Sequence, residues 1–235
     1  MELTDQQIQE LYKFTRKHYV YYYDVQSELV DHLANDIEEI WEEYPKISFE
    51  DARDKSFKKF GIFGFMDVVE AKEKQMHKRY WKIIWRFAKE WFTIPKVLLT
   101  VIIFISVFLL LNIPFADYII LSLLSIAMIF ELIAIYKIGK KQKNKEVKKE
   151  KIFLLEAMIG TSRNGYSGFV FINLFNFVNL TKVDLYQINI YWQISIALLC
   201  TLLIILFQVS HFVLPQKTEE LLQETYPEYK MTKSL

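Results

Sequence analysis

The sequence predicts an all-α protein in which an N-terminal cytoplasmic helical domain is followed by a four-helix transmembrane bundle. Three observations lead to this prediction: helix caps and amphipathic patterns near the start, long apolar runs later, and an alternation of basic loops between those runs. The overall composition, with 52% apolar residues and a net charge of +1, resembles that of a soluble protein. This average combines two unlike parts, because residues 1–92 carry 15 Lys and Arg against 18 Asp and Glu, and residues 93–235 carry 14 against 10. The single cysteine, Cys200, excludes a disulfide scaffold.

The first 45 residues predict two helices. Thr4 and Gln7 have the spacing of a capping box, which begins a helix running from about Asp5 to Lys17. A second helix begins near Asp24 and ends before Pro45. Its apolar residues recur at helical spacing and predict one buried stripe. The stripe consists of Val25, Leu29, Leu33, Ile37, Ile40, Trp41 and Tyr44.

Two further helices lead towards the apolar part of the chain. Ser48 is placed to cap a third helix, which Gly61 ends, and a long fourth helix begins near Met66. The fourth helix closes with the segment HKRYWKIIWRFAKEWF, in which aromatic and basic residues alternate. This composition is typical of a helix at the level of the lipid headgroups, with interface candidates Trp81, Trp85, Arg86 and Trp91. The alternative is an ordinary helix that packs its aromatic residues on its neighbours.

Four segments have the length or composition of membrane spans. They cover about residues 94–113, 118–138, 165–181 and 190–214. The third is the weakest, because asparagines recur within it. Pro95 marks the point where the chain is expected to change direction as it enters the first span.

The basic loops predict the orientation of the spans. Lysines and arginines precede the first span, concentrate in the Lys137–Lys151 loop and recur in the C-terminal tail, and are scarce in the other links. By the positive-inside rule, both termini are cytoplasmic in a multi-pass inner-membrane protein. The Lys137–Lys151 loop is expected to attract anionic lipid headgroups. It lacks the arginine and aromatic partners of a nucleic-acid site, so direct nucleic-acid binding is not expected. The predicted organisation is a domain at 1–78, an interfacial link at 79–96, a membrane region at 97–214 and a cytoplasmic tail at 215–235.

Polar side chains within the spans are candidates for function. Glu131 lies well inside the second span, and Asn173 and Asn176 share a face of the third. Ionisable groups in such segments usually face a bundle interior or a watery path. The structural alternative is a protonated or hydrogen-bonded Glu131 near the inner interface and asparagines that hold helices together.

The second helix carries a polar face beside its apolar stripe. The partner-binding candidates on it are Asp24, Glu28, Asp31, His32, Asp36 and Glu39. An acidic face suits a basic protein partner, and the alternative is plain solvation. Glu28 and His32 have a spacing that metal sites use, but one helix supplies only part of a shell. We therefore expect no metal and no cofactor, and expect His32 at the edge of the core, bonded to Asp36 or to the backbone.

The motifs DVQSELVDHLANDIEEIW, P-x-x-SFEDA and KKFG-x-x-G follow one another within residues 24–64. In this order they resemble the HAAS-type helical domain of bacterial membrane proteins, including flavobacterial members, over roughly residues 5–75. The resemblance implies a signalling module that binds a PadR-like transcription regulator.

Two functions follow from these features. The leading hypothesis is a membrane protein whose cytoplasmic domain binds a signalling partner. The alternative is a small transporter or channel subunit with a polar path at Glu131 and the asparagine face, which would require a homo-oligomer or other partners. No nucleophile elbow, P-loop or metal motif is present in the sequence, so an enzyme is not expected.

Overall fold

A computed structural model describes the backbone of residues 2–147, 150–181, 184–227 and 229, and their side chains except at 142, 146–147, 161–167, 177 and 180–181. The fold is 81% helix, with no strand in the described part of the chain. It divides into two compact units. The first unit comprises residues 1–79 and 148–157, and the second comprises 80–147 and 158–235. Two helices, α4 (Met66–Lys89) and α7 (Leu154–Thr181), begin in the first unit and continue into the second.

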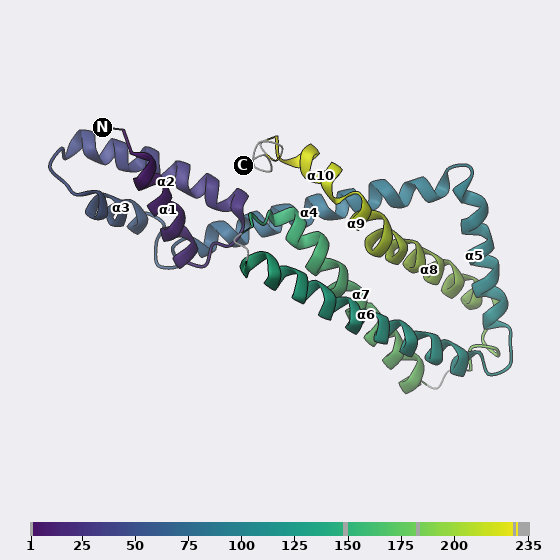
Figure 1. Ribbon diagram of the computed structural model, residues 1–235. Helices are drawn as coiled ribbons and strands as arrows, with labels where there is room; N and C mark the ends of the chain where they lie inside the picture. Colours follow the sequence, from purple (N-terminus) through teal and green to yellow (C-terminus); the bar gives the residue numbers. More distant parts are fainter. Residues whose placement is uncertain (1, 148–149, 182–183, 228, 230–235) are drawn as a thin grey trace. The chain divides into compact units, whose positions relative to one another are not determined.

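The first unit is built around helix α2 (Tyr23–Glu43), which packs against α1 (Asp5–Lys17) and α3 (Phe49–Lys58) (Figure 1). The predicted stripe on α2 forms the core from Val25 to Trp41, where six of its seven members are buried. The seventh prediction is wrong, because Tyr44 is 52% exposed; the Lys55 ammonium lies 3.8 Å from the centroid of its ring. Tyr44 follows the last residue of α2, where the chain has left the helical path.

Local side-chain hydrogen bonds set where the first helices begin. The Thr4 hydroxyl accepts from the Gln7 N–H at 3.3 Å, and the Gln7 side-chain oxygen accepts from the Thr4 N–H at 2.8 Å. The expected capping box is therefore present. The Ser48 hydroxyl likewise accepts from the Asp51 N–H at 3.1 Å at the start of α3.

A tight turn joins α3 to α4. Gly61 and Gly64 both have positive φ, at 78° and 56°, a region that residues with a Cβ rarely adopt. Behind the turn, Phe65 is buried and its ring meets those of Phe57 and Phe60 at centroid distances of 4.7 and 4.9 Å. The two glycines thus allow the chain to reverse directly over an aromatic cluster.

The second unit contains the remaining helices. These are η1 (Glu90–Phe92), a 3₁₀ turn, α5 (Lys96–Leu111), α6 (Ala116–Val147), α8 (Ile190–Gln208), the π-helical turn η2 (Val209–Val213), α9 (Leu214–Gln216) and α10 (Thr218–Thr225). Helix α5 packs along α8. An apolar cluster that includes Leu111, Leu185 and Ala197 holds the contact together.

The described residues contain two helices long and apolar enough to cross a membrane, Ala116–Lys145 and Ile190–Gln216. A third candidate is the bent pair Met66–Phe92 and Lys96–Leu111, whose axes meet at 89°. The break falls at residues 93–95, where a change of direction was expected at Pro95. Many apolar side chains on α6 are exposed, as expected of a surface that faces lipid; Phe130 is 67% and Leu132 65% exposed. These features are consistent with a membrane protein.

Two segments differ from the sequence prediction. Helix α6 continues to Val147, so most of the predicted Lys137–Lys151 loop is helical, since lysine, glutamine and glutamate are good helix formers. Residues 148–149 of that loop lie outside the described part. The predicted tail also contains α10, whose Leu221 and Leu222 are each 1% exposed. Arg86 on α4 pairs with Glu224 on α10 at 3.1 Å.

The turn between α3 and α4 generates a stability prediction. Replacing Gly64 by Ala places a Cβ 2.8 Å from the Phe57 ring in addition to the strain of positive φ, whereas Gly61→Ala adds strain alone. We expect Gly61→Ala to cost about 1–2 kcal/mol and Gly64→Ala to cost more. Hydrogen exchange of the α2 amides in the full chain measures both. Equal losses for the two variants would contradict the packing of Phe57 against Gly64.

Candidate functional sites

The acidic face of α2 is partly neutralised by neighbouring helices. Asp36 pairs with Lys59, which follows α3, and Glu28 pairs with Lys72 of α4 at 2.6 Å. Burial by itself would raise the pKa of Asp36, but the hydrogen bond and charge of Lys59 outweigh it and hold that pKa below its usual value. Two of the six partner-binding candidates therefore serve as ties between helices of the first unit.

Three other candidates are exposed on α2, namely Asp31, His32 and Glu39. The expectation that His32 lies at the core edge beside Asp36 is wrong, because its side chain is exposed and Asp36 faces Lys59. The reason is helical geometry: His32 precedes the buried Leu33 by one residue, a step of about 100° around the helix.

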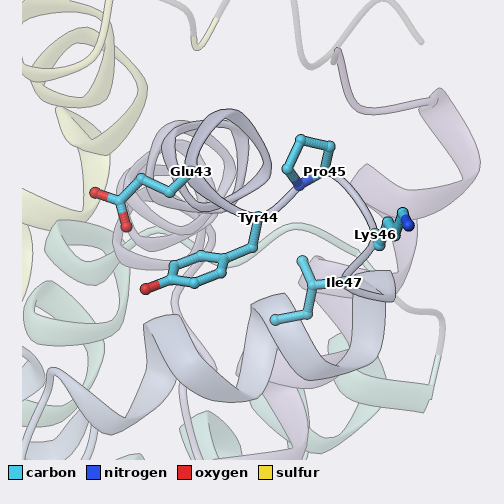
Figure 2. Close-up of a pocket in the computed structure, with 5 residues that line it drawn as sticks. All are labelled: Glu43, Tyr44, Pro45, Lys46 and Ile47. Atoms are coloured by element: carbon cyan, nitrogen blue, oxygen red, sulfur yellow. The ribbon is translucent and has the colours of Figure 1, made fainter.

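The C-terminal end of α2 extends this exposed surface. Glu42 and Glu43 are exposed, and the turn that follows borders a hollow of about 490 Å³. Figure 2 shows Tyr44 and Ile47 on one side of this turn and Pro45 on the other. A single five-residue stretch lines the hollow, so it is a shallow part of a surface and does not enclose a ligand. We call the exposed residues Asp31, His32, Glu39, Glu42 and Glu43 the acidic surface.

The sixth candidate, Asp24, contacts a distant segment of the chain within the first unit. Its Oδ1 accepts a hydrogen bond from the backbone N–H of Leu154 at 2.9 Å. Leu154 is the first residue of α7, and the free N–H groups at a helix start favour a nearby carboxylate. Asp24 therefore caps a helix that lies 130 residues further along the chain.

Neighbouring contacts hold the same segment on α2. The Tyr23 N–H donates to the carbonyl oxygen of Ile152 at 2.8 Å. The Tyr23 ring meets Phe153 edge-on at a centroid distance of 5.5 Å, and the Lys151 ammonium lies 4.3 Å from the centroid of the same ring. Phe153, Leu154 and Leu155 are all nearly fully buried. The segment before α7 is thus an integral part of the first unit, which no local sequence signal indicates.

A buried acid–base pair lies in the second unit. Glu131 on α6 and His211 in η2 approach to 2.7 Å between Oε1 and Nε2, with side-chain exposures of 4% and 9%. Both residues belong to helices that are apolar enough to span a membrane. A carboxylate buried in apolar surroundings is costly unless a partner compensates it, so the contact explains how Glu131 is accommodated.

The surroundings of His211 fix its ring. The ring stacks on Phe207 at a centroid distance of 4.0 Å, and Nδ1 lies 2.9 Å from the Ser210 hydroxyl and 3.2 Å from the Phe207 carbonyl oxygen. These contacts leave Nε2 facing Glu131. π-Helical turns such as η2 occur frequently at functional sites. Sequence reasoning singled out Glu131 and missed His211, although each lies six residues before a lysine at the end of its apolar run, Lys137 and Lys217.

The predicted asparagine face does not join this pair. Asn173 and Asn176 are both exposed on α7. The Asn173 amide donates to the Phe169 carbonyl oxygen of its own helix at 2.8 Å, so it does not bridge two helices as expected. A side-chain amide that finds a local carbonyl needs no partner helix.

The four interface candidates occupy different surroundings. Trp85 is 44% exposed, Arg86 pairs with Glu224, and Trp81 is half-buried. Trp91 is 9% exposed, and its carbonyl oxygen accepts from the Thr100 hydroxyl at 3.0 Å. Trp91 therefore helps to fix the turn into α5, and Trp85 is the most exposed of the three tryptophans.

No three His, Cys, Asp or Glu side chains among those described lie close enough to hold a metal ion.

The cap at α7 generates a second prediction. Asp24→Ala removes the acceptor for the Leu154 N–H and should cost about 0.5–2 kcal/mol, which speeds hydrogen exchange at the start of α7 several-fold. Asp24→Asn keeps an acceptor oxygen and should restore most of the protection. Asp31→Ala, an exposed acid on the same helix, is the matched control and should leave α7 unchanged. Equal exchange in all three variants would contradict the capping role.

The buried pair generates a third prediction. Glu131→Leu or His211→Leu alone leaves one polar partner buried and should lower stability by about 3 kcal/mol. The double variant removes both polar groups and should lose much less than the sum of the single losses. Thermal unfolding of the full chain in detergent measures the difference. Additive losses would show that the two side chains do not interact.

Comparison of the chain with known protein families, with curated proteins and with solved structures finds no match. The resemblance to HAAS-type proteins therefore remains a prediction that rests on the residues of the first unit.

Proposed function

We propose that this chain is a four-span inner-membrane protein, with both termini in the cytoplasm, whose first unit binds a cytoplasmic signalling partner. The partner is a basic protein, and the HAAS resemblance implies a PadR-like transcription regulator. In this proposal the lysines of 137–151 hold the cytoplasmic ends of the spans near anionic lipid headgroups.

The observation that carries the proposal is the double role of α2. One part of this helix presents the acidic surface, and its first turn holds the start of α7 through Asp24 and Tyr23. Helix α7 continues directly into the second unit. A partner bound to α2 therefore acts on the element that anchors α7, without an intervening flexible linker at that point.

Charge supports a basic partner. Asp31, Glu39, Glu42 and Glu43 are exposed on α2, and the helix contains no lysine or arginine. Opposite charge across an interface steers association and selects partners more than it adds affinity. A helix face that only contacts water needs no more than scattered charges. The exposed acids of α2, by contrast, continue along the helix into the Glu43–Ile47 turn.

Binding of the full-length protein in detergent to a purified PadR-like regulator tests the proposal. We expect Asp31→Lys with Glu39→Lys to weaken binding at least tenfold at low salt and to remove most of its salt dependence. Glu70→Lys, an exposed glutamate on α4, is the matched control and should leave binding unchanged. No binding by the wild-type protein at low salt would overturn the proposal.

A second candidate function is favoured by one observation, the buried pair of Glu131 and His211. Ionisable pairs inside apolar helices mark proton or ion paths in many membrane proteins. As a transporter or channel subunit, a chain with so few spans would work as a homo-oligomer. Proton flux into vesicles containing the purified protein separates the two functions. Proton flux that disappears in the Glu131→Gln variant supports a proton path through the pair. Absence of proton flux with the wild-type protein eliminates this function.

A further inference from the structure

The turn between α3 and α4 exposes two large apolar side chains at its tip. Ile62 is 99% and Phe63 is 70% exposed, and Ile62 is the most exposed large apolar residue in the described part of the chain. Exposed apolar residues that adjoin one another are a feature of surfaces that contact a membrane or a protein. We call Ile62 and Phe63 the apolar tip.

The turn is held in this conformation by its own hydrogen bonds. The Gly61 N–H donates to the Lys58 carbonyl oxygen, the Gly64 N–H to that of Gly61, and the Met66 N–H to that of Phe63, at 3.2 to 3.3 Å. Phe65, directly after the turn, is 1% exposed in the aromatic cluster.

The space beneath the tip is already filled. A Cβ on Gly64 would come within 2.8 Å of the Phe57 ring, so the turn lies directly on the aromatic cluster. The apolar tip therefore cannot fold inward without displacing Phe57. Its exposure is a fixed feature of the turn and requires no rearrangement before it meets a partner.

Charge beside the tip points to the kind of partner. Lys58 and Lys59 directly precede the turn, with Lys55 one helical turn earlier, and Asp67 follows in the first turn of α4. Lys59 is paired with Asp36, and Lys55 lies over the Tyr44 ring. Lys58 is exposed beside the tip. The tip thus has an exposed base on its N-terminal side and the exposed Asp67 on its C-terminal side. An apolar tip with an exposed lysine beside it fits the boundary between acyl chains and anionic headgroups when the lysine side faces the lipid.

The orientation of the helix that follows the tip indicates where a membrane surface would lie. Helix α4 begins at Met66, three residues after Phe63, and the Met66–Phe92 helix meets α5 at 89°. If α5 crosses the bilayer, a helix at right angles to it runs along the membrane surface. Tethering of this kind raises the effective concentration of lipid around the tip, so even weak insertion is favoured.

We propose that Ile62 and Phe63 insert into the headgroup region of the bilayer that holds this chain, and that Lys58 contacts an anionic headgroup. The proposal rests on the membrane location in the proposed function and is independent of the signalling partner. The occupant is the lipid bilayer rather than a second protein, because of the lysine beside the tip and the perpendicular helix that follows it.

The experiment uses the full chain with Cys200→Ser, placed in nanodiscs of phosphatidylcholine with or without phosphatidylglycerol. An environment-sensitive NBD dye is attached at Ile62→Cys, and at Glu50→Cys, an exposed position on α3, as the matched control. We expect a blue-shifted emission at 62 but not at 50, with loss of most quenching by aqueous iodide and gain of quenching by spin-labelled lipid. Phosphatidylglycerol should enlarge the shift, and Lys58→Glu should remove that enlargement.

A dye-free measurement guards against insertion driven by the label. Hydroxyl-radical oxidation of Phe63 in the unlabelled chain should fall several-fold in nanodiscs with phosphatidylglycerol, and Ile62→Ser should restore it. Unchanged hydrogen exchange in α2 verifies that the variants fold. Water-like emission at 62 together with full oxidation of Phe63 would overturn the proposal. A blue shift that depends on protein concentration and not on lipid would also overturn it and would assign the tip to a protein contact. Neither assay contains the regulator, so failure here is distinct from failure of partner binding.

Discussion

The hydrogen bond from the Leu154 N–H to the Asp24 carboxylate is the contact on which the attachment of the start of α7 to α2 depends. It joins the start of α2 to the start of α7, elements separated by 130 residues. A helix start presents unsatisfied N–H groups and a partial positive charge, so a carboxylate there fixes both the position and the register of α7. Because Tyr23 pairs with Ile152 next to it, the segment before α7 lies on α2 as an extra layer of the first unit. A conformational change in α2 would therefore alter the contacts that hold the start of α7.

The Glu131–His211 pair imposes the matching constraint in the second unit. Two polar groups buried at 2.7 Å between apolar helices fix the rotation of each helix, since turning either one would leave a polar group among hydrocarbon side chains. Each residue lies six positions before a terminal lysine, or about 9 Å along a helix. If Lys137 and Lys217 lie at the same face of the membrane, Glu131 and His211 therefore lie at the same depth. His211 lies within the π-helical turn, and its Nε2 faces Glu131.

Local signals predicted much of the fold, and contacts between distant segments account for the errors. Thr4, Ser48 and the apolar stripe of α2 act within a few residues, so their helices and buried faces could be predicted from the sequence. The hydrogen bond of Asp24 with Leu154 was not predicted, because no spacing rule relates two residues 130 positions apart. His211 was missed for the same reason, although Glu131 was identified. His32 was misplaced because one step of about 100° around the helix separates it from the buried Leu33, and Tyr44 because α2 ends one residue before it.

Electrostatics at a membrane surface would connect the acidic surface to the apolar tip. An anionic membrane attracts Lys58 and repels the carboxylates of Asp31, Glu39 and Glu43, and both effects act over about 10 Å at physiological salt. A first unit that inserts Ile62 and Phe63 would therefore be driven to turn its exposed acids away from lipid and towards the cytoplasm. Apolar insertion and charge repulsion would then fix one orientation of α2, which is the condition for a bound partner to act on α7.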